Sequence, residues 1–317
     1  MRFTSILVYL LSCSACACAD RNAYRLLDGA FAYEQAGDPD AALEAFRGAV
    51  EVQPDDPYLR RILGRALLQR EMYEAAVSEL ETVLGAEPHY LEAYQDLAYA
   101  LSAQGMPEAG MGWLERAVRE VGAYLPIQRQ LVDLYLTHDR SEEAMALLTD
   151  AVERWPDETW AHFLLGKLYQ QLDMVEKAEA AFRRSVKIEP DLGVAYASLG
   201  NLLYEQRRYS DAIQAYTEAI SINTRDHASL NNLAWVYATE GTKLEMAERL
   251  SRRSLRLVPD SPTYLDTLAE IYFRAGEREL ATQFVRQAIV LRPDDPELME
   301  HLRRQLKRFT APNHGKV

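Results

Sequence analysis

Apolar residues along most of the chain recur at spacings of three and four, the pattern of short amphipathic helices. In residues 193–226 two such sets follow each other: Tyr196, Leu199 and Leu203, and then Ala212, Tyr216 and Ala219. Gly200 stands between the apolar positions of the first set, where a side chain would hold the two helices apart. Neither helix can bury its apolar face alone, so the pattern predicts a helix pair that requires neighbouring pairs.

The same pattern of two helices recurs along the chain at a nearly constant period. Eight repeats span residues 23–56, 57–90, 91–124, 125–158, 159–192, 193–226, 227–261 and 262–295. Position 8 of a repeat is Ala or Gly in all but one of them, and position 20 is Ala or Gly in each. Position 24 is mostly large. Small residues let the two helices of a pair approach closely, and a large residue fills the groove against the next pair.

Helix boundaries are marked in the same register. Six repeats have proline at position 32, where it ends the second helix: Pro54, Pro88, Pro156, Pro190, Pro259 and Pro293. The pairs Asp56-Pro57, Ser261-Pro262 and Asp295-Pro296 combine an N-cap residue with proline at the first helical position. The repeat 193–226 has Thr224 in place of proline, so we expect a less sharp boundary there.

These residues resemble the tetratricopeptide repeat, whose pattern is well represented by Leu165, Gly166, Tyr169, Ala178, Phe182 and Pro190. The resemblance covers residues 23–295 and implies an all-α right-handed superhelix of antiparallel helix pairs, an α-solenoid with first helices on the concave face. Residues 296–309 predict a capping helix, because Leu298, Leu302 and Leu306 recur every four residues. Residues 310–317 are expected to form a disordered tail.

Composition narrows the possible functions. The chain is 48% hydrophobic with a formal net charge of -13, which suits a soluble, ordered protein and argues against a nucleic-acid partner. Its three cysteines all precede residue 19, so the repeats have no thiol chemistry. Common catalytic motifs are absent, and the six histidines fall at different repeat positions, so we expect no metal, no cofactor and no enzymatic activity.

Residues 1–19 are typical of an export signal, with Arg2 before a short apolar run from Ile6 to Leu11. This run is too short to span a bilayer, which takes roughly 20 residues. The sequence Leu-Leu-Ser before Cys13 resembles the bacterial lipobox, in which the cysteine carries the lipid, and Cys16 fits that motif less well. The prediction is therefore a periplasmic protein anchored to the membrane through Cys13 or Cys16.

An alternative cleavage site follows in the same segment. Ala17-Cys18-Ala19 matches an A-x-A motif, and cleavage after Ala19 would release a soluble exported protein that begins at Asp20.

The resemblance also implies where a ligand is held. In the family, contacts come from positions 2, 5, 9, 12 and 13 of each first helix. The residues selected here are Arg61, Arg65, Tyr99, Arg129, Trp160, Phe163, Lys167, Asn201, Tyr204, Asn231, Trp235, Asp266 and Phe273. Their aromatic members favour an apolar track for an extended peptide or helix, although any one of them can instead pack against a neighbouring first helix.

Asparagines add a polar element to this track. Asn201, with Asn231 or Asn232, is expected to bond to the backbone of a peptide. Chaperone-binding family members instead clamp a terminal carboxylate with cations at positions that are here Ala197, Thr263 and Thr267. That clamp is therefore not predicted.

Two functions are compatible with these observations. The first is a scaffold in the bacterial cell envelope that binds a protein or peptide partner on its concave face. Envelope members of the family commonly assist pilus, secretion, outer-membrane or polysaccharide assembly, and this is an analogy at the level of the fold. The second is a structural spacer or oligomerising subunit that acts through the solenoid ends and the convex face.

Overall fold

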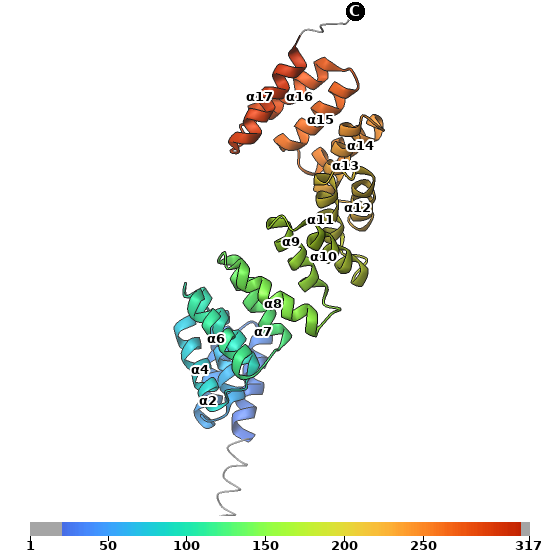
Figure 1. The fold of residues 1–317 in the computed structure, drawn as a ribbon. Coiled ribbons are helices and arrows are strands. Elements are labelled where there is room, and N and C mark those ends of the chain that lie inside the picture. Colours follow the sequence, from blue (N-terminus) through green and yellow to red (C-terminus); the bar gives the residue numbers. More distant parts are fainter. Residues whose placement is uncertain (1–20, 312–317) are drawn as a thin grey trace, which may run out of the picture. The chain divides into compact units, whose positions relative to one another are not determined.

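The computed structural model describes residues 21–311, which form helices joined by short turns and contain no strand (Figure 1). A helix over residues 21–36 is followed by α2 (Pro39–Val52), α3 (Pro57–Gln69), α4 (Tyr73–Ala86), α5 (Leu91–Ala103), α6 (Pro107–Glu120), α7 (Leu125–Thr137), α8 (Ser141–Arg154), α9 (Thr159–Gln171), α10 (Val175–Ile188), α11 (Gly193–Glu205), α12 (Tyr209–Ile222), α13 (His227–Glu240), α14 (Leu244–Leu257), α15 (Pro262–Arg274), α16 (Arg278–Val290) and α17 (Pro296–Thr310). The predicted all-α fold class is confirmed.

Some sequence predictions concern the ends of the chain. The export segment, including Cys13 and Cys16, lies outside the described residues. The tail was predicted to begin at residue 310, but Thr310 is the last residue of α17, and residues 312–317 lie outside the described range. Within residues 21–311, no helix combines the length and the apolar character needed to cross a membrane.

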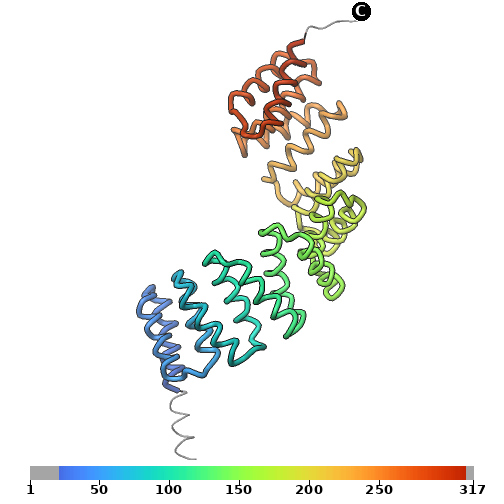
Figure 2. Tube along the Cα trace, turned by 60° about the vertical axis from the view of Figure 1, so that its left-hand side comes forward, coloured from blue at the N-terminus to red at the C-terminus, as the bar shows by residue number. Residues whose placement is uncertain are grey.

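The chain divides into two compact units, residues 1–147 and 148–317, with the boundary inside α8. Within each unit the helices run back and forth as antiparallel pairs, as Figure 2 shows. In the N-terminal unit α5 contacts both α3 and α7. In the C-terminal unit α9, α11, α13, α15 and α17 make a continuous row of such contacts. Because these first helices touch one another, they form the inner row of each stack.

Three helices begin with N-cap hydrogen bonds to the side chains that the sequence predicted as caps. The Asp56 carboxylate accepts bonds from the backbone N–H groups of Tyr58 and Leu59 at 2.9 and 3.2 Å. The Ser261 hydroxyl accepts one at 3.3 Å from Tyr264, and the Asp295 carboxylate caps α17 in the same way. These bonds satisfy N–H groups that have no partner inside the helix, so the three predicted N-caps are confirmed.

α12, which has Thr224 in place of a proline stop, ends as sharply as α10. α12 ends at Ile222, two residues before Thr224, just as α10 ends two residues before Pro190. The side-chain oxygen of Asn223 accepts a bond of 3.0 Å from the backbone N–H of Arg225 and turns the chain. The expected weak boundary at Thr224 was therefore wrong, because an Asx turn replaces the proline.

One regularity of the turns was not anticipated. The fifteenth residue of each repeat has a left-handed backbone with φ between 56° and 87°: Gly37, Glu71, Gly105, Asp139, Asp173, Arg207, Gly241 and Gly276. Half of them are not glycine, although a left-handed conformation costs a residue with a Cβ about 1–2 kcal/mol. The turn geometry between paired helices is therefore imposed by packing rather than by local sequence preference.

Candidate functional site

A pocket of about 270 Å³ lies on the inner row of the C-terminal unit. It is lined by Gln170 from α9, Asn201, Tyr204 and Glu205 from α11, Tyr216 from α12, and Asn232 and Trp235 from α13. We call it the α11 pocket. Three of the residues predicted from the sequence, Asn201, Tyr204 and Trp235, meet here.

The floor of the pocket depends on a glycine. A Cβ atom on Gly200 would lie 2.7 Å from two ring atoms of Tyr216, so the ring rests directly on the backbone of α11. This close approach brings the Tyr216 hydroxyl through to the inner row, where it donates a bond of 2.7 Å to the Asn201 side-chain oxygen. Burial raises the pKa of Tyr216, which keeps the hydroxyl neutral and able to donate.

The two asparagines on the pocket wall are joined to each other. The Asn232 amide nitrogen donates a bond of 3.0 Å to the same oxygen of Asn201. The amide N–H groups of Asn201 and the amide oxygen of Asn232 form no hydrogen bond to other residues in the range 21–311. The pair therefore offers a donor and an acceptor whose directions are held by Tyr216.

Aromatic side chains make another part of the lining. The indole N–H of Trp235 donates to the Tyr204 hydroxyl at 2.6 Å, and the Tyr204 ring lies 5.7 Å from that of Tyr209. Both Trp235 and Tyr204 are half-buried. Their rings are therefore held in place before any ligand arrives, while one part of each stays accessible.

The other aromatic residues predicted on α9 lie near this pocket but outside its lining. Phe163 is half-buried and packs against Phe182, with ring centroids 6.0 Å apart. Trp160 is half-buried, and Lys167 is exposed on the same helix. Phe163 therefore packs against α10, the second helix of its own pair.

Three predicted ligand residues are covered by the protein itself. Asn231 is only 3% exposed, and Asp266 only 5%. The ring of Phe273 stacks on Phe309 of α17, with centroids 4.6 Å apart. Asn231 and Asp266 are buried, and Phe273 is half-buried with its ring against α17, because α13 turns Asn231 inward and α17 packs on α15. We therefore leave them out of the site.

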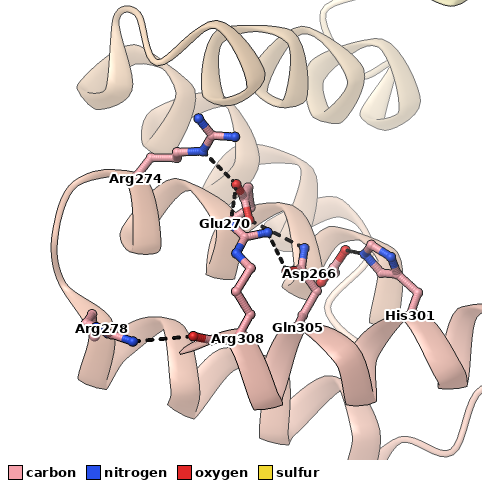
Figure 3. A network of polar contacts seen from close by, with 7 residues as sticks. All are labelled: Asp266, Glu270, Arg274, Arg278, His301, Gln305 and Arg308. Atoms are coloured by element: carbon pink, nitrogen blue, oxygen red, sulfur yellow. Dashed lines mark hydrogen bonds and ion pairs between the residues drawn. The ribbon is translucent and has the colours of Figure 1, made fainter. Parts of the chain in front are cut away.

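The cover over α15 is a network of charged side chains, drawn in Figure 3. Glu270 accepts bonds from Arg274 at 2.7 Å and from Arg308 at 2.6 Å, and its carboxylate is only 4% exposed. His301 Nε2 lies 2.9 Å from an oxygen of Asp266, and this bond raises the pKa of His301. α17 therefore packs on the open end of the last pair, against both α15 and α16, where a ninth first helix would lie.

The predicted residues of the N-terminal unit are either exposed or already ion-paired. Arg61 pairs with Asp96 at 2.7 Å. Burial raises the pKa of Asp96, and the Arg61 charge acts in the opposite direction. Arg65 and Arg129 are exposed, and Tyr99 is 57% exposed. The positive charge of Arg61 is thus already paired with a carboxylate of the same protein.

Sequence reasoning missed two lining residues, Glu205 and Tyr216, whereas it gave Asn232 as an alternative to Asn231, and Gln170 stands at position 12 of its repeat, one of the contact positions. Glu205 occupies position 13 of its repeat, one of the positions from which the family contacts ligands, so that register could have identified it. Tyr216 sits at the large core position 24, and only the tertiary structure shows that its hydroxyl reaches the inner row. Within residues 21–311, no cluster of three or more His, Cys, Asp or Glu side chains is placed to hold a metal ion.

Comparisons with known proteins agree with this architecture. Models of the tetratricopeptide repeat match residues 27–79, 67–131, 135–202 and 193–225. The chain is 22% identical over 283 residues to Hsp70-Hsp90 organizing protein 2 of Arabidopsis thaliana, covering 88% of this chain and 43% of that protein. It is 25% identical over 115 residues to Hsp70-Hsp90 organizing protein 1 of Glycine max, covering 36% of this chain and 20% of that protein. The chain thus spans less than half the length of these curated relatives.

A solved structure provides a comparison of the fold. The crystal structure of YrrB, described as a TPR protein with an unusual peptide-binding site, superposes with a TM-score of 0.52 at 20% identity. The match covers 60% of this chain and 97% of that one. At this identity the likeness concerns the fold alone.

Proposed function

The chain belongs to the tetratricopeptide repeat family, and from this premise we propose that it is a non-enzymatic scaffold that holds an extended segment of a partner protein in the α11 pocket. The observation that carries the proposal is the bonded pair of Asn201 and Asn232, which keeps one amide donor and one amide acceptor unused. A peptide backbone offers the complementary pair at every residue.

The size of the pocket limits what it can hold. At about 270 Å³ it falls below the range of roughly 300–1,000 Å³ that is usual for small-molecule sites. It suits a single side chain and its peptide group, with Trp235 and Tyr204 as the walls for that side chain. The rest of an extended segment would follow the inner row past α9, where Trp160 and Lys167 lie.

The relatives support a peptide ligand but do not identify it. Two of them are named as organizing proteins of Hsp70 and Hsp90, and YrrB is described as having a peptide-binding site. In this chain Ala197, Thr263 and Thr267 replace the cations of the chaperone clamp. We therefore propose a ligand held along its backbone rather than by a terminal carboxylate.

The double variant Asn201→Ala, Asn232→Ala is expected to weaken peptide binding about tenfold, because it removes two backbone bonds of about 0.5–1.5 kcal/mol each. Trp235→Ala should weaken it about thirtyfold or more, as expected for an aromatic anchor worth about 2 kcal/mol. The measurement is calorimetric titration of the full chain with a 12-residue peptide selected on it from a random display library.

Gln171→Ala is the matched control, since this exposed residue adjoins Gln170 but is outside the pocket lining. Equal affinities of the wild type and both pocket variants would exclude this site. If Trp160→Ala combined with Trp235→Ala also left partner capture in cells unchanged, the alternative function as a spacer acting through the ends and convex face would be favoured.

We infer a location from the first residues alone, which lie outside the described structure. The proposal is that the chain is exported in a bacterium and anchored in the envelope through Cys13 or Cys16, where it serves the assembly of a surface or secretion system. Metabolic palmitate labelling is expected in the wild type. It should be lost in either Cys13→Ser or Cys16→Ser. Labelling unchanged in both variants would exclude both sites, and no labelling of the wild type would favour the soluble form cleaved after Ala19.

A further inference from the structure

The α11 pocket has an excess of acceptors and no positive charge. Its lining includes the Glu205 carboxylate and no lysine, arginine or histidine. The hydrogen bond that Glu205 receives within residues 21–311 comes from Gln170, at the limiting distance of 3.5 Å. The amide oxygens of Gln170 and Asn232 receive none in the same range. The carboxylate and these two amide oxygens can therefore each accept a hydrogen bond from a ligand.

The cations close to this pocket do not neutralise Glu205. Arg208, in the turn after α11, bonds to Asp211 at 2.6 Å and to Glu179 at 2.7 Å. Arg207 and Lys167 are exposed and form no ion pair within residues 21–311. Lys167 lies one helical turn before Gln170 and contributes nothing to the lining.

From this arrangement the geometry points to an arginine side chain of the partner segment as the occupant of the α11 pocket. This inference rests on the proposed function and adds the chemistry of the ligand. A guanidinium group carries five N–H donors, enough to serve the carboxylate and the two amide oxygens together. Its flat face can lie against the accessible part of Trp235 or Tyr204, the cation–π contact that aromatic rings favour.

Other side chains fit the pocket less well. An acidic side chain would meet the Glu205 carboxylate with no cation in the lining to offset it. An apolar side chain would take the carboxylate and amide oxygens out of water without replacing their hydrogen bonds. A lysine would supply the charge but not the planar set of donors. The net charge of -13 on the whole chain adds long-range attraction for a basic partner.

The test titrates the full chain with four blocked pentapeptides of alanine whose central residue is arginine, citrulline, leucine or glutamate, up to millimolar concentration. Citrulline keeps the shape of arginine and removes its charge. The readout is the indole N–H signal of Trp235 in a ¹H–¹⁵N spectrum, assigned with Trp235→Phe among the four tryptophans. The arginine peptide is expected to bind about tenfold more tightly than the citrulline peptide.

Glu205→Gln should remove most of this preference, and added salt should weaken only the arginine peptide. Glu240→Gln, an exposed residue of α13 outside the lining, makes the same change in net charge and should leave the preference intact. Equal binding of the arginine and citrulline peptides would overturn the inference while the proposed function stands. No shift of the Trp235 signal with any of the peptides would overturn both.

Discussion

Replacement of Phe309 by alanine is expected to lower the free energy of unfolding of the last helices by about 3–5 kcal/mol, the usual cost of deleting a buried phenylalanine ring. Phe309 is 2% exposed, stacks on Phe273 and lies 5.1 Å from the Arg308 guanidinium. Its loss opens a cavity between α15 and α17 and loosens the cover over Asp266 and Glu270.

The effect should be local, because each helix pair of a solenoid contacts mainly its neighbours. Amide hydrogen exchange of the full chain is therefore the measurement. We expect faster exchange in α15, α16 and α17, and unchanged exchange in α3 to α5 of the N-terminal unit. Lys307→Ala, an exposed neighbour on α17, should change stability by less than about 0.5 kcal/mol. Equal protection of α17 in the Phe309 variant and the wild type would contradict the packing described for the cover.

Gly200→Val is expected to destabilise the C-terminal unit by about 1–3 kcal/mol and also to weaken peptide binding. The new side chain would push against Tyr216, since a Cβ at this position lies 2.7 Å from two ring atoms. Movement of the ring withdraws its hydroxyl from Asn201 and frees the amide pair of the α11 pocket. Denaturant unfolding followed by circular dichroism gives the first effect, and the calorimetric titration gives the second.

Two further variants separate steric crowding at Gly200 from the general effect of replacing a helical glycine by valine. Gly85 lies in α4 with nothing within 4 Å of the position its Cβ would take, so Gly85→Val should be nearly neutral. Combining Gly200→Ala with Tyr216→Leu reproduces the pairing of Ala98 with Leu114 and should recover stability while peptide binding stays weak. A stable Gly200→Val variant that still binds the peptide would show that the ring does not need the glycine.

The helices of this protein could be predicted because their signals are local. The apolar spacing, the N-caps Asp56, Ser261 and Asp295, and the prolines after second helices act within one turn of the residues they organise. Thr224 shows the limit of a single signal. The proline was missing, but the next-best local device, the Asx turn of Asn223, was one residue away and ended α12 in the same place.

The candidate site could be predicted only in part, because exposure on the inner row depends on distant segments. Repeat register placed Asn201, Tyr204 and Trp235 on first helices, and these three meet in one pocket. It placed Asp266 and Phe273 on an equivalent face as well, yet α17 covers them with residues about 35 positions later in the chain. Whether a register position is open therefore depends on what packs above it.

The sequence by itself determined the stack of paired helices, because each pair has an apolar face that only another pair can cover. It also determined that the repeats have no thiol chemistry, because no cysteine lies in them. Tertiary structure decided what the inner face offers to a ligand. Tyr216 reaches the face across Gly200 and orients the two asparagines, and Glu205 is left without a cation while Glu270 receives two. The reason is physical: periodicity sets which side of a helix a residue occupies, but contacts between helices set whether its polar atoms are already satisfied.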